Sequence, residues 1–226
     1  MTSLVERRVV RGLFAQRLYP GTGEAFDRLH REAWPGLLDE VRRTGIGQFT
    51  GFRRDSDAWF YIESIGEPEA ALRHLADMPA YRTLRHNLRD VVLSDGELAG
   101  TFYREVFHTD EGPSLGERQT RAMLSLVIDP ERSEAYDALH AEPWPELIDA
   151  LANSGFRNYS GFRRGPHVVY YGEYHPDMRA VFERMATHEV DARWGAALDG
   201  VITTIRGSDG WLITADELVH LQTSDR

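Results

Sequence analysis

Apolar and polar residues follow two different periods along this chain, and the order of those periods occurs twice. Runs rich in apolar, aromatic or β-branched residues have the length of strands, whereas leucine and valine recur at helical spacing between them. The first part of the chain predicts strands at 13–18, 46–53, 58–65 and 101–107, with helices around 29–41 and 67–91. The second part predicts strands at 123–128, 156–163, 168–174 and 212–221, with helices around 139–151 and 176–198.

Each part therefore has the order strand, helix, strand, strand, helix, strand, which is the plan of the ferredoxin-like βαββαβ unit. Both helices of such a unit cover one face of its sheet, and the other face stays apolar in patches. A second sheet of the same kind can bury that face. We therefore expect an α+β fold in which tandem ferredoxin-like repeats form an intramolecular dimeric α+β barrel.

A shift of 110 residues brings the two parts into register. Between residues 24 and 63, 17 of 40 positions are identical to the residue 110 positions later, whereas average residue usage would give about two or three matches. The matched pairs include His30 with His140, Trp34 with Trp144 and Pro35 with Pro145. A tandem duplication explains this identity. We call residues 8–108 the first half and 119–222 the second half, joined by a polar linker at 109–118 that carries glycine and proline.

Composition excludes several classes of function. The formal charge of −10 repels polyphosphate backbones, so nucleic acid is not expected as a partner. All 26 basic residues are arginine and cysteine is absent, which excludes a lysine Schiff base, a disulfide and a thiolate. The histidines lack metal-ligand spacing, and no phosphate-binding glycine loop occurs. Without a membrane-length apolar window or a signal segment, a cytoplasmic protein without membrane contact is expected.

Candidate chemistry lies on the first helix of the second half. Tyr136, His140 and Trp144 are spaced four residues apart, so a phenol and an imidazole share one helix face. Pro145 has no N–H to donate, and a kink or a new helix start is expected there. Such a break would hold His140 at the rim of a pocket. In the alternative interpretation, His140 and its counterpart His30 are half-buried structural residues.

A longer set of residues resembles the L-rhamnose mutarotase family. It comprises Tyr136-x-x-x-His140-x-x-x-Trp144-Pro145-Glu146-Leu147, Asn158-Tyr159, Tyr170-Tyr171, Arg193-Trp194 and Glu217-Leu218-Val219-His220, and it spans nearly all of residues 119–221. The first half is similar more loosely, through His30, Trp34, Pro35, Leu37 and Glu105-Val106-Phe107-His108. The resemblance implies a dimer made covalent, a pocket within each half, and an aldose 1-epimerase that needs neither metal nor organic cofactor.

The resemblance also implies roles for individual residues. His140 and Tyr136 would form the acid–base pair, with His30 as the counterpart in the first half. The substrate-binding residues would be Tyr159, Trp144, Trp194, Arg193, Tyr171 and Trp34. Several positions depart from the family pattern. In the first half, Phe26 and Phe49 stand at the positions equivalent to Tyr136 and Tyr159, and in the second half Gly195 stands where a second tryptophan is common.

Two alternatives to a sugar mutarotase stay open at this point. Cofactor-free polyketide cyclases share the dimeric α+β barrel, and the lost hydroxyl groups of the first half favour such a change of substrate. A barrel that binds a ligand without catalysis is the other alternative, because a fold does not determine a function. In each case the expected partner is a small molecule, either a sugar or a polyketide-like compound. A homodimer of fused chains is compatible with all three.

Overall fold

The computed structural model describes residues 9–93, 101–110, 120–175, 177–205 and 215–222. The chain divides into two compact units, and each is considered by itself. Unit 1 comprises Met1–Tyr103 and Asp216–Arg226, and unit 2 comprises Arg104–Ala215.

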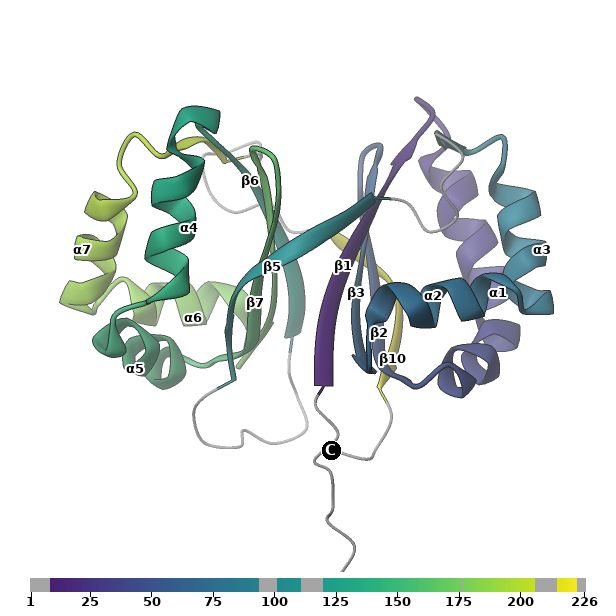
Figure 1. The fold of residues 1–226 in the computed structure, drawn as a ribbon, viewed down its shortest axis with the longest axis horizontal. Coiled ribbons are helices and arrows are strands. Elements are labelled where there is room, and N and C mark those ends of the chain that lie inside the picture. Colours follow the sequence, from purple (N-terminus) through teal and green to yellow (C-terminus); the bar gives the residue numbers. More distant parts are fainter. Residues whose placement is uncertain (1–8, 94–100, 111–119, 176, 206–214, 223–226) are drawn as a thin grey trace, which may run out of the picture. The chain divides into compact units, whose positions relative to one another are not determined.

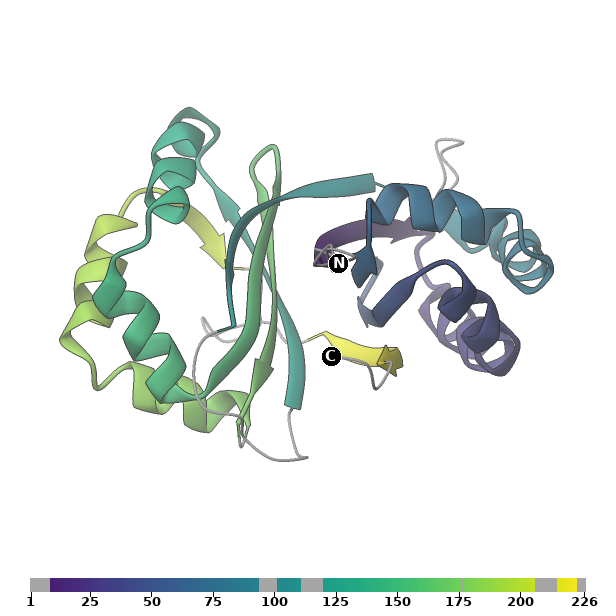
Figure 2. The same cartoon turned by 60° about the horizontal axis from the view of Figure 1, so that its bottom comes forward.

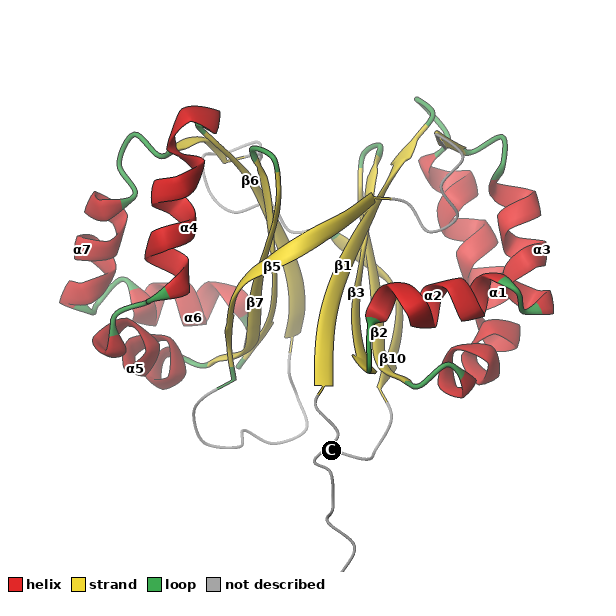
Figure 3. Ribbon diagram, viewed as in Figure 1, coloured by secondary structure: helices red, strands yellow, loops and turns green. Residues whose placement is uncertain are grey.

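Unit 1 is an antiparallel sheet with helices on one face (Figure 1, Figure 3). Its strands pair in the order β10, β2, β3, β1, β5, and the short β4 also pairs with β1. Their bounds are β1 Val9–Leu18, β2 Ile46–Arg54, β3 Asp57–Ile65, β4 Val92–Leu93, β5 Thr101–Thr109 and β10 Asp216–Gln222. The helices are α1 Gly23–Arg43, α2 Pro68–Ala76 and α3 Pro79–Leu88.

Unit 2 repeats this plan around a curled sheet (Figure 2). The strand order is β5, β7, β8, β6, β9, where β5 enters unit 2 at Arg104. The remaining strands are β6 Thr120–Ile128, β7 Phe156–Arg164, β8 His167–Tyr174 and β9 Ile202–Ile205. A 3-10 turn at Pro130–Arg132 precedes the helices α4 Ser133–Ala141, α5 Pro145–Ser154, α6 Met178–Met185 and α7 Glu189–Ala197. The predicted α+β class is confirmed in both units.

The last strand of each half pairs with the sheet of the other half. In β10, Glu217 is opposite Phe52 of β2, and in β5, Glu105 is opposite Phe162 of β7. A histidine on each of these strands also contacts a buried hydroxyl: His220 Nδ1 lies 2.9 Å from Thr50 Oγ1, and His108 Nδ1 lies 2.9 Å from Ser160 Oγ. Each compact unit therefore takes its last strand from the other half of the sequence. The boundaries of the two halves, 8–108 and 119–222, stay predictions from the sequence. Most of the proposed linker lies outside the described residues.

The first helix differs between the halves although its sequence aligns. In the first half, α1 continues through Pro35 for 21 residues. In the second half, α4 ends at Ala141 and α5 begins with Pro145 after an extended Trp144. The second half has a further proline at 143, and a residue before proline is disfavoured in the helical region. The break expected at Pro145 is thus confirmed, while Pro35 alone does not end its helix.

The second helical segment of each half forms two helices. In the first half the break falls at Pro79, which takes the first position of α3. In the second half the segment predicted at 176–198 divides into α6 and α7 without a proline. There Asp177 caps α6 by accepting a hydrogen bond from the Ala180 N–H at 2.9 Å. The sequence pattern missed the short strands β4 and β9.

Candidate active site

His140 is held in one tautomer by the helix that carries it. Its Nδ1 atom lies 2.8 Å from the carbonyl oxygen of Tyr136, and a carbonyl can only accept. The Nδ1 atom therefore carries the proton, and in the neutral ring the Nε2 atom is the acceptor. The rings of Tyr136 and His140 stack with centroids 4.0 Å apart. The expectation that these two residues share one helix face is met.

The hydroxyl of Tyr170 occupies the acceptor position of this histidine. Tyr170 lies on β8, and its hydroxyl oxygen is 2.7 Å from Nε2 of His140. Because Nε2 accepts, Tyr170 donates, and the Tyr170 oxygen accepts in turn from the hydroxyl of Tyr136, with which it makes a short hydrogen bond. A directed chain thus runs from Tyr136 through Tyr170 to His140. The sequence did not single out Tyr170 as a site residue, although it is part of the Tyr170-Tyr171 pair.

Burial keeps the side chains of Tyr136, Tyr170 and His140 uncharged at neutral pH. His140 is 4% exposed, and burial lowers its pKa against the opposing effects of the Tyr136 carbonyl and of the Asp137 carboxylate. Burial likewise raises the pKa of Tyr136 and Tyr170 far beyond the neutral range. The imidazole is therefore available as a base, and both phenols keep their protons.

His140 and Tyr170 lie on the wall of a cavity of about 150 Å³ in unit 2. The cavity is mainly apolar and aromatic, and its walls are formed by Phe107, His140, Leu147, Leu151, Phe156, Tyr159, Tyr170, Phe182, Met185, Asp191 and Trp194. Trp194 meets His140 edge-on with ring centroids 5.2 Å apart, and Tyr159 stacks on Tyr170 at 5.2 Å. Apolar walls with a few convergent polar groups are typical of small-molecule sites.

A β-bulge directs Tyr159 toward this cavity. The register of β7 against β8 shifts between Arg157 and Ser160, and Asn158 has a positive φ of 42°. The extra residue puts Tyr159 on the same sheet face as Phe156, although the two are three residues apart. On β8, a Cβ atom on Gly172 would lie 2.9 Å from Cδ2 of Tyr159, so the glycine leaves room for the ring.

Some of the other predicted site residues of the second half do not line the cavity. Tyr136 is 0% exposed and lies behind Tyr170, so it does not line the cavity. Trp144 packs edge-on against Trp194, and the exposed Arg193 places its guanidinium 4.9 Å from the centre of the Trp144 ring.

Tyr171, another predicted binding residue of the second half, points away from the cavity. It donates a hydrogen bond to Glu173 Oε1 at 2.9 Å. Successive strand residues point to opposite faces, so Tyr171 cannot share the cavity with its neighbour Tyr170. The assignment of Tyr171 to substrate binding therefore does not fit this cavity.

Asp191 on α7 is a cavity residue that the sequence did not indicate. Burial raises the pKa of its carboxyl group, and nearby His188 opposes this effect. No motif contains this aspartate, and only the packing of α7 against the sheet brings it to the cavity.

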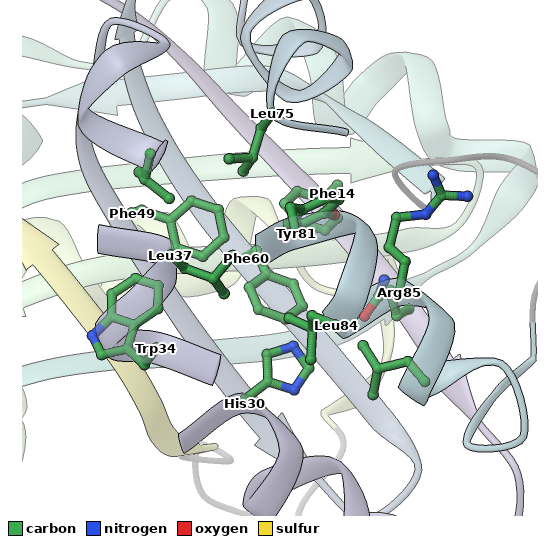
Figure 4. Close-up of a pocket in the computed structure, with 13 residues that line it drawn as sticks. Phe14, His30, Trp34, Leu37, Phe49, Phe60, Leu75, Tyr81, Leu84 and Arg85 are labelled. Carbon is green, nitrogen blue, oxygen red and sulfur yellow. The ribbon is translucent and has the colours of Figure 1, made fainter. Parts of the chain in front are cut away.

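The equivalent region of the first half is almost filled (Figure 4). His30, Trp34, Phe49, Phe60 and Leu84 are among the residues around a cavity of only about 30 Å³, which is the space of one water molecule. The Nδ1 atom of His30 donates to the carbonyl oxygen of Phe26 at 2.9 Å. Among the described residues, none offers a hydrogen bond to its Nε2 atom.

The alignment of the two halves explains why His30 has no hydroxyl group as a partner for its Nε2 atom. Phe60 stands 110 residues before Tyr170, and Phe26 stands 110 residues before Tyr136. Burial lowers the pKa of His30 to about 4, against the hydrogen bond to Phe26 and the field of Asp27. The first half thus keeps a neutral, packed histidine, and His30 and Trp34 have no cavity of substrate size.

Over the described residues, no group of three or more His, Cys, Asp or Glu side chains is placed to hold a metal ion. None of the described helices is long and apolar enough to cross a membrane.

Comparison with known proteins confirms the resemblance for the second half. Residues 121–221 match the family model of L-rhamnose mutarotase. The L-rhamnose mutarotase of Paraburkholderia xenovorans is 35% identical over 63 residues, which is 28% of this chain and 49% of that protein. The chain thus matches about half of this relative. The L-rhamnose mutarotase of Burkholderia ambifaria is 28% identical over 38% of this chain and 80% of its own length.

Two solved structures are similar over nearly the whole chain. A monooxygenase candidate from Fusobacterium nucleatum has a TM-score of 0.60 at 8% identity, covering 96% of this chain and 95% of its own. An anthrone oxidase-like protein has a TM-score of 0.52 at 13% identity, covering 96% and 98%. At these identities the likeness shows the fold alone, and the expected α+β barrel fold is confirmed.

Proposed function

We propose that the cavity of the second half is the active site of an acid–base isomerase that interconverts the anomers of a reducing sugar. The observation that carries this proposal is the hydrogen-bonded chain from Tyr136 through Tyr170 to His140, which meets the cavity wall at Tyr170 and His140. The family match over residues 121–221 supports the same chemistry. It favours a mutarotase over the cyclase alternative.

Opening a pyranose ring requires the removal of a proton from the anomeric hydroxyl and the delivery of one to the ring oxygen. Tyr170 and His140 suit the first step. As the Tyr170 oxygen takes the substrate proton, its own proton passes to Nε2 of His140, only 2.7 Å away. The resulting imidazolium is stabilised by the Tyr136 carbonyl and by the nearby Asp137 carboxylate. Reversal of the same transfers closes the ring on either face.

The remaining walls suit the apolar face of a sugar. Trp194 and Tyr159 present aromatic rings, which stack on the C–H face of a pyranose, and Trp144 supports Trp194 from behind. A cavity of about 150 Å³ holds a ligand the size of one six-membered ring. In the first half, the cavity of about 30 Å³ and the loss of both hydroxyl groups leave a packing role for His30.

The proposal is tested by saturation-transfer NMR on L-rhamnose and related aldoses, with anomer exchange rates compared among buffer, wild-type protein and His140→Ala. We expect acceleration by the wild type that is lost in His140→Ala and kept in His30→Ala, the same substitution at the equivalent position. A wild-type protein that binds a sugar without accelerating exchange would instead identify a ligand-binding barrel. Circular dichroism spectra establish that each variant is folded.

A further inference from the structure

The carboxylate of Asp191 lacks the ion-pair partners that Asp137 of the same unit has. Asp137 pairs with Arg163 at 2.5 Å and with Arg104 at 2.6 Å. Asp191 makes no side-chain hydrogen bond or ion pair with any of the described residues, yet it lies on the cavity wall. Asp191 is partly buried on that wall, and a carboxylate with no protein partner that faces an aromatic cavity is a candidate functional group.

The groups around Asp191 come from several elements. His188 immediately precedes α7, and its field favours the ionised carboxylate. Tyr159 on β7 lies close enough for the Asp191 charge to raise the pKa of its phenol. His140 on α4 and Tyr170 on β8 line the same cavity, whereas no arginine is among its described wall residues.

Asp191 is also placed on the helix face that reaches His140. It precedes Trp194 by three residues, so the two side chains lie on one face of α7. Trp194 in turn meets the His140 ring at 5.2 Å between centroids. Two proton-carrying groups therefore line one cavity from different walls, the Tyr170–His140 pair from β8 and α4, and Asp191 from α7.

We propose that Asp191 is the second acid–base group of this site and exchanges a proton with the ring oxygen of the sugar. This inference rests on the proposed function. In ring opening, the anomeric proton moves to Tyr170 while the Tyr170 proton moves to His140. The C1–O5 bond breaks, the carbonyl forms, and O5 takes the proton of the Asp191 carboxylic acid. In ring closure each proton returns, so the reaction is balanced without a co-reactant.

This assignment differs from the pair expected from the sequence. Tyr136 was the expected partner of His140, but its hydroxyl is fully buried and donates to Tyr170, so it cannot reach a sugar. Raising the pKa of Asp191 through burial increases the fraction of carboxylic acid near neutral pH, which suits a proton donor.

The test compares Asp191→Asn, which keeps the side-chain size, with Asp199→Asn, an exposed aspartate just beyond α7. Anomer exchange is measured by saturation-transfer NMR at several sugar concentrations and pH values. We expect Asp191→Asn to lower the maximal rate about 100-fold with little change in KM, and to remove one limb of the pH profile. Asp199→Asn should match the wild type.

A second variant separates proton transfer from simple binding. In Asp191→Ala, added formate should restore part of the lost rate, because the small acid fits the space left by the carboxyl group. An active wild type with an Asp191→Asn variant of equal rate would overturn the role of Asp191 and leave the proposed function intact. A wild-type protein that exchanges no aldose would overturn both.

Discussion

The hydroxyl of Tyr170 lies 2.7 Å from Nε2 of His140 and joins a strand to a helix through a proton-transfer contact. Because the Nδ1 proton of His140 is held by the Tyr136 carbonyl, this contact has only one direction in the neutral state. The equivalent pair in the first half, Phe60 and His30, has lost the hydroxyl and keeps only a ring contact at 5.6 Å.

Replacing Tyr170 with phenylalanine should lower the rate of anomer exchange about 100-fold while the fold is kept. The change reproduces the first half, where Phe60 packs against His30, but it leaves the Tyr136 hydroxyl without its acceptor. A loss of stability of about 1–3 kcal/mol is therefore expected as well. Saturation-transfer NMR measures the rate, and urea unfolding measures the stability. Undiminished exchange by Tyr170→Phe would exclude the relay.

The substitution His30→Ala should lower the stability of the protein and leave the exchange rate nearly unchanged, whereas His140→Ala should abolish the exchange activity. His30 is buried among apolar rings around a cavity of about 30 Å³, so its removal leaves an unfilled space. We expect a loss of about 2–5 kcal/mol in the free energy of unfolding and an exchange rate close to that of the wild type. Equal kinetic losses in the two variants would show that both halves contribute to catalysis.

The stability of the protein should depend on the charge state of His30 below neutral pH. Its pKa is lowered from 6.5 to about 4 in the folded state, so the unfolded chain binds more protons between these values. Stability therefore falls as the pH drops from 6.5 toward 4, by about 3 kcal/mol for this residue. Urea midpoints of the wild type should fall relative to those of His30→Leu as the pH drops across this range, because leucine does not titrate. A difference between the two urea midpoints that stays constant with pH would contradict the lowered pKa of His30.

Gly172→Ala should disturb the cavity through Tyr159. An added Cβ atom would lie 2.6 Å from the hydroxyl oxygen of the buried Tyr174 and 2.9 Å from Cδ2 of the partly buried Tyr159. We expect a loss of about 1–3 kcal/mol in stability together with weaker sugar binding. The control is Gly195→Ala, where an added Cβ meets no atom within 4 Å. A Gly172→Ala variant that binds sugar as the wild type does would show that the Tyr159 ring does not contribute to the site.

The sequence by itself determined the longer strands, the helical segments and the position of the central histidine, but not the short strands β4 and β9 or the division of α6 from α7. Periodicity is a local property, so strands, helices and the break at Pro145 follow from neighbouring residues alone. The spacing of Tyr136 and His140 likewise brings their rings together wherever that helix packs. The family resemblance of the second half was also present in the sequence, since it depends on residue identities and not on packing.

Only the tertiary structure decided which groups face the cavity. Tyr170 and Tyr171 are adjacent in sequence, but the pleat sends one to His140 and the other to Glu173. Asp191 reaches the cavity through the packing of α7, which no short-range pattern encodes. The exchange of β5 and β10 likewise depends on pairings between residues far apart in the chain. Local spacing specifies an element and its faces, whereas burial, partners and cavity size depend on what packs against that element.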